Sequence, residues 1–501
     1  MIFRNYNLKL ALYLSILYLI CILSVGANAQ SNFPNIIFIL ADDLGYGDVQ
    51  CLNAQGKIPT PHINSIASSG LKFTDAHSTS AVCTPTRYSI LTGRYAWRTR
   101  LKRSVLGPYD TPLIEEGRTT IASMLKKAGY RTAAFGKWHL GFNWSTNNGE
   151  KPIDKAGLNN LLYEEKISGG PIDHGFDYFF GVDAPNFPPY AYIENNHLSE
   201  IPSHFYSKHP YGDCRPGTGI KEWKLERIMP ELKNRAVQYI NEAAKIQQPF
   251  FLYLPLTAPH TPIAPSDQYI GKSNLNVYAD FVMEVDDVVG SILSTLQKNK
   301  LTENTLVIFT SDNGCSPQAN FNFLKEKEHD PSAGFRGHKA DLFEGGHRIP
   351  LLIQWPERLP KNKTVQQTVS SVDFMSTCAS IVGYELKENE AEDSYNILPL
   401  LLKPTTKKPI RDATVHHSFL GEFAIRKGKW KLLLTPGSGG WSFPINPKDL
   451  EGLPDVQLYN MENDSAEKNN LEHKHPKIVS ELKALLQQYV AAGKSVNKYS
   501  K

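Results

Sequence analysis

Four short apolar runs, each followed by polar residues, constrain the fold of this chain more than any other feature. They cover residues 35–40, 131–135, 249–256 and 305–310. Runs of this length and composition are typical of strands that are buried on both faces of a parallel sheet. Helical patterns lie between them, at residues 119–128, 231–245 and 278–297. Strands that alternate with helices predict an α/β fold with a large, mainly parallel sheet flanked by helices.

The polar residues after these runs form four clusters. The clusters are Asp42 with Asp43, Lys137 with His139, His260, and Asp312 with Asn313. Ligands of open α/β sheets bind beyond the carboxyl ends of the strands. We therefore expect the four clusters to meet at one edge of the sheet and to bind a ligand there.

The two acidic clusters predict a metal site. Their four side chains offer only oxygen ligands, which suit Ca²⁺, or less well Mg²⁺, rather than zinc. Either cluster alone also fits a turn or a helix cap. Two acid pairs after two buried strands favour a cation, because adjacent carboxylates repel each other until a cation or protons neutralise them. Together with Lys137, His139, His260 and Lys339, the cation would bind an anionic group with tetrahedral oxygens.

The first thirty residues have the pattern of a targeting signal. Arg4 and Lys9 precede an apolar run, and residues 27–29 (ANA) offer the small side chains of a cleavage site. We predict a signal peptide over residues 1–29 and an exported, periplasmic or secreted protein. An uncleaved anchor is the alternative, since the run is long for a signal. No later run reaches the roughly 18 apolar residues of a spanning helix, so we expect no stable membrane insertion.

Charge and cysteine content exclude two classes of protein. The 54 basic and 50 acidic residues leave a net charge of +4, without the clustered basic bias of a nucleic-acid-binding protein. Six cysteines in 501 residues are too few for a small disulfide scaffold. Five remain after the predicted cleavage, so at least one must be free or have a special role.

The composition changes near residue 385. An acidic stretch at residues 385–393 is followed by a Thr/Lys/Pro linker at residues 404–409. Short strands are then indicated within residues 422–434 and 456–459, and an amphipathic helix over residues 477–492. We predict a large domain over residues 30–400, which carries the site, and a small α+β domain over residues 401–501.

The most specific motif is residues 83–94 (CTPTRYSILTGR). It resembles the signature of type I sulfatases, Cys-x-Pro-x-Arg followed by Leu-Thr-Gly-Arg, whose five-residue core is expected by chance in roughly one such chain in eighty. Other stretches resemble the family in the family's order: residues 34–48, 136–141, 259–260, 311–314, 344–350, 398–402 and 458–460. The chain looks similar to the arylsulfatase A and galactosamine-6-sulfatase branch.

The resemblance implies an alkaline-phosphatase-like fold and a Cys83 that a maturation enzyme oxidises to formylglycine. A thiolate that attacked sulfur would leave a stable thiosulfate ester. A hydrated aldehyde has two geminal hydroxyls instead. One attacks the sulfate ester, and the other then loses its proton and expels sulfate, which regenerates the aldehyde.

The resemblance also implies a role for each predicted site residue. Asp42, Asp43, Asp312 and Asn313 hold Ca²⁺ together with an oxygen of residue 83. Arg87 and His139 hold the hydrate, Lys137 and Lys339 bind sulfate oxygens, and His260 protonates the leaving alkoxide with help from Lys339. Asp312 accepts the proton of the attacking hydroxyl.

Three further residues of these motifs carry expectations. Pro85 is expected at the first position of a helix, which would place residue 83 at the helix N-terminus, where an anion is favoured. Tyr88 and His347 depart from the family pattern, which has a small residue and Val there. Either of the two could line a substrate pocket.

Residues 186–214 form a long stretch without a clear helix or strand pattern, rich in His, Tyr and Phe. Stretches this long inside a domain are often functional, although this one could also simply cover the core. We predict that His204 and His209 contact sugar hydroxyls, and that a bacterial enzyme of this kind acts on fragments of sulfated polysaccharide. Two alternatives remain: a phosphodiesterase or phosphonate monoester hydrolase of the same superfamily, and a glycan-binding protein without catalysis.

Overall fold

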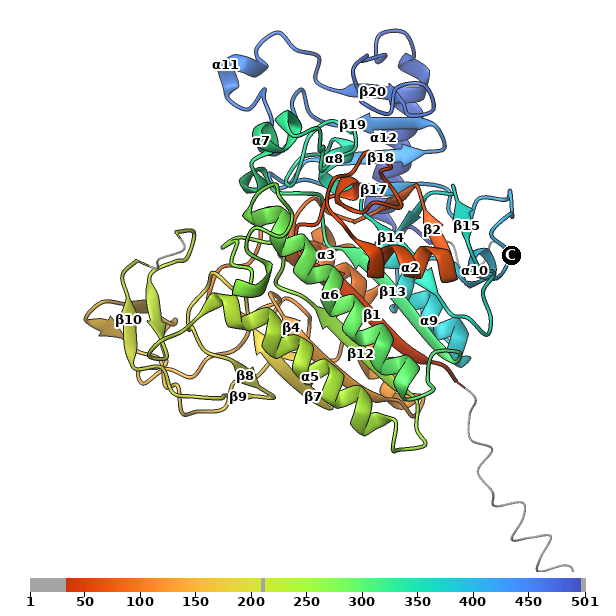
Figure 1. Cartoon of the computed structure of the whole chain (residues 1–501). Helices are drawn as coiled ribbons and strands as arrows, with labels where there is room; N and C mark the ends of the chain where they lie inside the picture. Colours follow the sequence, from red (N-terminus) through yellow and green to blue (C-terminus); the bar gives the residue numbers. More distant parts are fainter. Residues whose placement is uncertain (1–32, 209–211, 497–501) are drawn as a thin grey trace, which may run out of the picture. The chain divides into compact units, whose positions relative to one another are not determined.

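The four apolar runs form adjacent strands in the centre of a ten-stranded sheet in the computed structural model (Figure 1). The structure describes residues 33–208 and 212–496, so the predicted signal peptide lies outside the described residues. Pro34–Lys501 groups as one compact unit. Among the described helices, none is both long enough and apolar enough to cross a membrane.

The sheet is mixed but mainly parallel. Its strand order is β15 (Lys363–Val365), β2 (Leu71–Phe73), β14 (Leu351–Gln354), β13 (Thr305–Ser311), β1 (Asn35–Ala41), β12 (Phe250–Pro255), β4 (Arg131–Lys137), β7 (Tyr178–Val182), β8 (Ile193–Glu194) and β9 (His197–Leu198). The five strands from β13 to β7 run parallel. Antiparallel pairs flank them on both sides. The predicted α/β class is confirmed, and the carboxyl ends of β1, β4, β12 and β13 share one edge.

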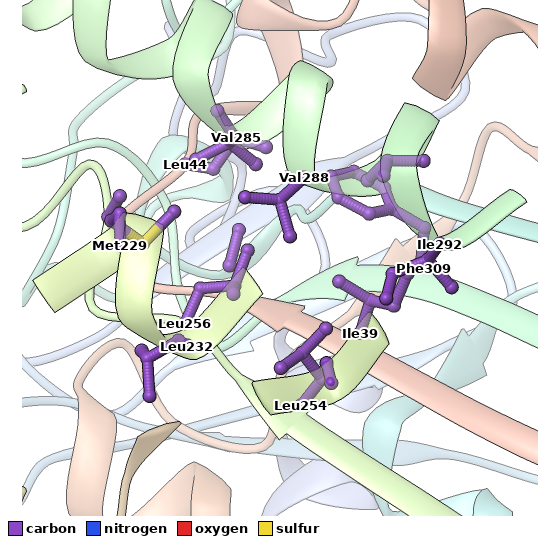
Figure 2. Close-up of a cluster of buried hydrophobic side chains, with 14 of the residues drawn as sticks. Ile39, Leu44, Met229, Leu232, Leu254, Leu256, Val285, Val288, Ile292 and Phe309 are labelled. Carbon is purple, nitrogen blue, oxygen red and sulfur yellow. The ribbon is translucent and has the colours of Figure 1, made fainter. Parts of the chain in front are cut away.

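Both faces of the sheet are covered by helices, which explains why its strands are apolar throughout. On β1, Ile39 points into a core formed with α5 (Ile228–Ala243) and α6 (Val277–Lys298). Figure 2 shows this core, in which Leu254 and Phe309 of the neighbouring strands lie with Ile39 below Ile292 of α6. Phe38 points the other way, and its ring packs edge-on against Phe374 of α9 (Phe374–Val382) at 4.9 Å. Strands with period-two side chains and two covered faces have no polar face.

A second, antiparallel sheet follows in the chain. It consists of β17 (Thr414–His417), β18 (Phe423–Lys427), β19 (Trp430–Leu433) and β20 (Gln457–Asn460). The turn between β18 and β19 contains Gly428, whose φ of 55° favours glycine. The helix α12 (Pro476–Ala491) packs on this sheet through a small core that includes Leu482 and Leu486. The predicted strands and helix of this region are present, and the boundary near residue 400 stays a prediction.

The two residues that depart from the family pattern, Tyr88 and His347, are both fully buried and make contacts with other protein groups. Tyr88 donates a hydrogen bond to Glu115 Oε2 at 2.9 Å. His347, in α8 (Glu344–His347), belongs to a buried polar cluster with His77, His416 and Lys431. This cluster connects the segments around the large sheet to β17 and β19 of the small one.

Hydrogen bonds account for the ring nitrogens of that cluster. Asp75 accepts from His77 Nε2 at 2.7 Å, so His77 Nδ1 can accept from His347 Nδ1 at 3.0 Å. His347 Nε2 lies 2.9 Å from the Lys431 ammonium and 3.0 Å from the carbonyl oxygen of Leu342, and its ring stacks on His416 at 3.9 Å. Three histidines this close also have a spacing that suits a metal ion. The adjacent ammonium and the contacts between the rings favour a hydrogen-bonded network instead.

Candidate active site

The four polar clusters meet at the carboxyl edge of the large sheet. Lys137 Nζ, at the end of β4, lies 2.8 Å from Asp42 Oδ2, directly after β1. The backbone N–H of Asp43 donates to Asp312 Oδ1 at 3.2 Å, which joins the ends of β1 and β13. His260, after β12, places Nε2 3.7 Å from Asp43 Oδ2. All of these side chains are buried, so their charges interact with little screening by water.

Cys83 and Arg87 enter the same site from a buried helix, α3 (Cys83–Thr92). Cys83 is the first helical residue and is 2% exposed. The helix therefore begins two residues before Pro85, and the expectation that Pro85 is its first residue is wrong. Proline is still tolerated there, because the N–H groups of a first turn have no partner within the helix. Burial raises the pKa of the Cys83 thiol to about 12.

Arg87 lies one turn after Cys83, on the same face of α3. Its Nε and Nη2 donate to Asp312 Oδ2 at 3.0 and 2.7 Å, and Nη2 is 3.2 Å from Asp42 Oδ1. The guanidinium is fully buried among these carboxylates. It therefore fixes the two acid clusters relative to residue 83.

The acidic residues fit a metal ion. Ligand atoms of Asp42, Asp43, Cys83 and His260 lie within 4.8 Å of one another. Asn313 Nδ2 donates to Asp43 Oδ1 at 2.7 Å, while Asn313 Oδ1 is buried and has no hydrogen-bond partner among the described residues. An orphaned buried oxygen beside carboxylates is a natural cation ligand. The donor set therefore suits a hard divalent cation, with a thiol sulfur at the position where the resemblance places an oxygen of residue 83.

Each carboxylate after β1 is paired with a lysine. Lys137 contacts both oxygens of Asp42, at 3.1 and 2.8 Å, and Lys339 Nζ lies 2.7 Å from Asp43 Oδ2. Burial works against the charged form of Asp42, but Lys137, His260 and Arg87 hold its pKa at about 2. Burial likewise works against the ammonium of Lys339, and Asp43 raises its pKa. The two lysines thus occupy the space beside the carboxylates that a cation and a bound anion would share.

The two site histidines present one ring nitrogen each. His139 Nε2 lies 3.0 Å from the carbonyl oxygen of Leu106, which can only accept, so Nε2 carries the proton. His139 Nδ1 is buried and has no partner among the residues that the structure describes. His260 Nδ1 donates to the carbonyl oxygen of Thr261 in the same way, which leaves Nε2 facing Asp43. Burial and the neighbouring lysines lower the pKa of both rings, that of His260 to about 4.

Asp183 is a site residue that the sequence analysis missed. It directly follows β7, whose Val182 pairs with Lys137 of β4. Asp183 accepts the backbone N–H of His139, and burial raises its pKa to about 7. Its Oδ1 is buried without a described partner. The apolar run YFFGV before Asp183 is the signal that would have revealed this fifth strand end.

The stretch over residues 186–214 contains the short strands β8, β9 and β10 (His204–Tyr206), so the expectation that it lacks strands is wrong. His204 is exposed, and its ring contacts Tyr206 at 4.6 Å. His209 lies outside the described residues. Phe187 is the residue of this stretch whose ring packs against a site side chain, His139, at 5.3 Å. The predicted sugar contacts of His204 and His209 stay predictions.

The five remaining cysteines are unpaired in the described structure. Cys83, Cys315 and Cys378 are buried, whereas Cys51 and Cys214 are half-buried. Because none of these five cysteines forms a disulfide in the described structure, their odd number leaves no single unpaired cysteine to explain. Cys83 alone of the five belongs to the group of ligand atoms at the carboxyl edge of the sheet.

Comparisons with known proteins identify a matching family and several relatives of this chain. A family model described as Sulfatase matches residues 34–384. An N-acetylgalactosamine-6-O-sulfatase of Bacteroides thetaiotaomicron is 33% identical over 92% of this chain and 94% of its own length. An N-acetylgalactosamine-6-sulfatase of Canis lupus familiaris is 29% identical over 81% of this chain and 74% of its own. A solved structure titled for the metabolism of multiple glycosaminoglycans by B. thetaiotaomicron has a TM-score of 0.78 and 31% identity, and it covers 91% of this chain and 99% of its own.

Proposed function

Because this chain belongs to the sulfatase family and is a sulfuric ester hydrolase, we propose that it hydrolyses sulfate esters of sulfated carbohydrates through a formylglycine at residue 83. The observation that carries the proposal is the buried group of Cys83, two carboxylates, two lysines and two histidines at one sheet edge. Relatives named for N-acetylgalactosamine 6-sulfate support a sulfated amino sugar as substrate. These relatives do not favour a phosphonate hydrolase or a non-catalytic glycan-binding protein.

The binding of sulfate follows from the charges of the site. A divalent cation, for which the oxygen ligands favour Ca²⁺, would be held by Asp42, Asp43, Asp312 and Asn313. Its charge would release Lys137 and Lys339 from the carboxylates that they contact in this structure. Both ammonium groups could then bind sulfate oxygens, since a buried ammonium needs an anionic partner.

The nucleophile requires chemistry at Cys83. Its conversion is a two-electron oxidation at Cβ that replaces sulfur by oxygen and releases sulfide, with the oxidant supplied by a maturation enzyme. Once hydrated, residue 83 offers one hydroxyl that attacks sulfur and a second that later loses its proton as sulfate departs. The buried thiol itself, with a pKa raised to about 12, would be a poor nucleophile at neutral pH.

The reaction would need three proton transfers in the site. Asp312 Oδ1 or Oδ2 accepts the proton of the attacking hydroxyl. Lys339 Nζ gives a proton to the sugar oxygen as its bond to sulfur breaks, directly or through His260 Nε2, which carries no proton of its own while Nδ1 is the protonated nitrogen. We infer that His139 Nδ1, which has no described partner, accepts the proton of the second hydroxyl.

The site of action is also part of the proposal. The N-terminal residues have the composition of a signal peptide. We infer an exported bacterial enzyme, periplasmic or secreted, that degrades fragments of sulfated polysaccharide. The maturation enzyme would then be a protein partner that this chain requires.

The experiment compares Cys83→Ala with Cys378→Ala, which removes a thiol of equal burial in α9. Protein is made with the maturation enzyme, and the mass of the peptide over residues 79–87 is measured together with sulfate release from N-acetylgalactosamine 6-sulfate. We expect the formylglycine mass in wild type and Cys378→Ala, and no turnover by Cys83→Ala. Near-normal turnover by Cys83→Ala, or by wild type whose peptide retains the thiol, would contradict the proposal.

A further inference from the structure

We propose that Arg215, stacked on Phe187, forms a subsite beside the active site that binds a second anionic group of the saccharide, a sulfate or a carboxylate other than the ester that is hydrolysed. The inference rests on the proposed function and makes saccharides with at least two anionic groups its preferred substrates. Its evidence is a chain of contacts that leads outward from His139.

Phe187 connects the cation to the catalytic residues. Its side chain is 5% exposed, and its ring meets the His139 ring edge-on, with centroids 5.3 Å apart. The Arg215 guanidinium carbon lies 4.3 Å from the centroid of the Phe187 ring, a cation–π contact. The distance from the guanidinium carbon to the centroid of the His139 ring is therefore at most the sum of these two distances.

The backbone of Arg215 is held in place. Its N–H donates to the carbonyl oxygen of Asn186 at 3.1 Å, and its own carbonyl accepts from the Tyr190 hydroxyl. These contacts bring together two segments that are far apart in sequence. A guanidinium that stacks through its face keeps its in-plane N–H groups available for bidentate contact with a sulfate or carboxylate.

Arg215 is also a cation without a carboxylate partner. Two other arginines over aromatic rings, Arg98 and Arg235, form ion pairs at 2.8 and 2.9 Å, whereas Arg131, Arg336 and Arg358 have no such pair among the described residues. Within residues 33–208 and 212–496, no carboxylate oxygen comes within the 4.0 Å ion-pair distance of Arg215. Asp110, the acid whose charge acts on Arg215, accepts the Gly107 N–H at 2.6 Å. An exposed, positioned guanidinium next to a sulfate pocket therefore retains its capacity to bind an anion.

The catalytic residues cannot supply this second contact. Lys137 and Lys339 lie at the bottom of the site and are needed for the sulfate that is hydrolysed. Arg215 is exposed whereas these lysines are buried, so its guanidinium can contact a part of the saccharide that the lysines do not reach. The subsite thus recognises what distinguishes one sulfated saccharide from another, because the hydrolysed group is common to all of them.

The test uses Arg215→Met, which removes the charge but keeps an unbranched apolar side chain on Phe187, and Arg215→Lys, which keeps the charge but loses the planar fork. The matched control is Arg235→Met, since Arg235 also stacks at 4.3 Å on a phenylalanine, Phe180. Substrates are nitrophenyl sulfate, N-acetylgalactosamine 6-sulfate, a 4,6-disulfated N-acetylgalactosamine, and a disaccharide of the 6-sulfated sugar with a uronic acid. Thermal unfolding checks that each variant folds.

We expect Arg215→Met to lower kcat/KM at least tenfold on the disulfated sugar or on the uronate disaccharide, and less than twofold on the two substrates with one anionic group. Whichever doubly charged substrate is affected identifies the second group. Arg215→Lys should fall between wild type and Arg215→Met, and Arg235→Met should match wild type. Equal losses on all four substrates would mean that Arg215 acts only through Phe187 and His139, and no loss on any would mean that it binds no substrate; either result overturns the inference. A wild-type enzyme that releases sulfate from none of the four would refute the proposed function itself.

Discussion

Replacing Lys339 by Met should make the stability of the protein depend strongly on its metal. Lys339 Nζ lies 2.7 Å from Asp43 Oδ2, and both groups are buried. Lys339→Met keeps the apolar stem and removes the charge. Without metal, the variant then has a buried Asp43 carboxylate that keeps only its contacts with Asn313 and, at 3.7 Å, with His260. With metal bound, the ion would neutralise that carboxylate.

The magnitude follows from this difference. Removing one partner of a buried ion pair costs about 3–5 kcal/mol. Removing the metal from wild type lowers the free energy of unfolding only by the contribution of metal binding, which is about 2.7 kcal/mol for an ion present at a hundred times its Kd. Chelation should therefore lower the free energy of unfolding by about 3 kcal/mol more in Lys339→Met than in wild type.

The assay is denaturant unfolding of both proteins, with Ca²⁺ and with a chelator. Lys233→Met is the control, because the Lys233–Asp287 pair is partly exposed at 3.0 Å and should contribute about 1 kcal/mol or less in either condition. Equal effects of the chelator on wild type and Lys339→Met would refute the reasoning, since Lys339 would then not take the place of the ion. This measurement needs no turnover, and all the proteins compared carry residue 83 in the same state.

Two further predictions concern buried polar groups. His347→Val should lower the free energy of unfolding by about 2–4 kcal/mol, because it leaves His77 Nδ1 without its partner and creates a small cavity. Denaturant unfolding measures this change. A decrease under about 1 kcal/mol would mean that the hydrogen-bonded network does not stabilise the fold. Asp183→Asn should change how stability depends on pH. The pKa of Asp183 is raised from 3.8 to about 7 on folding, so wild type loses stability as pH rises between these values, whereas Asn does not titrate. The variant should thus gain at least about 1 kcal/mol relative to wild type at pH 8 compared with pH 5, and a constant difference would contradict the assigned pKa shift.

The centre of the fold could be predicted because its strands are unambiguous in sequence. β1, β12 and β13 are continuous apolar runs, and helices α4 (Ile121–Lys127), α5 and α6 begin and end within three residues of the predicted patterns. β7 was missed because its five residues include Gly181, whose Cβ position lies against the backbone of Gly136 on β4. A glycine that permits this close approach of two strands weakens the strand pattern in sequence.

The residues of the candidate site also fall into those that the sequence could predict and those that it could not. Residues directly after a predicted strand, such as Asp42 and Asp312, could be placed because parallel strands bring their carboxyl ends together. Asp183 could not be placed without β7. Arg215 could not be placed at all from local pattern, because its position depends on hydrogen bonds with Asn186 and Tyr190, residues distant in sequence. Irregular segments follow tertiary contacts rather than periodicity, so their side chains had no predictable direction.

The burial of α3 limits the time in which the proposed maturation enzyme can reach Cys83. All ten residues of the helix are buried, so a second protein cannot reach Cys83 once the domain has closed. The strands β12 and β13, whose ends enclose the site, leave the ribosome long after residue 83. At roughly 5–20 residues per second, synthesis up to the end of β13 leaves an interval on the order of ten to fifty seconds in which Cys83 is still accessible. If residue 83 is converted as proposed, a chain that folds before conversion would stay inactive, and slower folding would raise the yield of active enzyme.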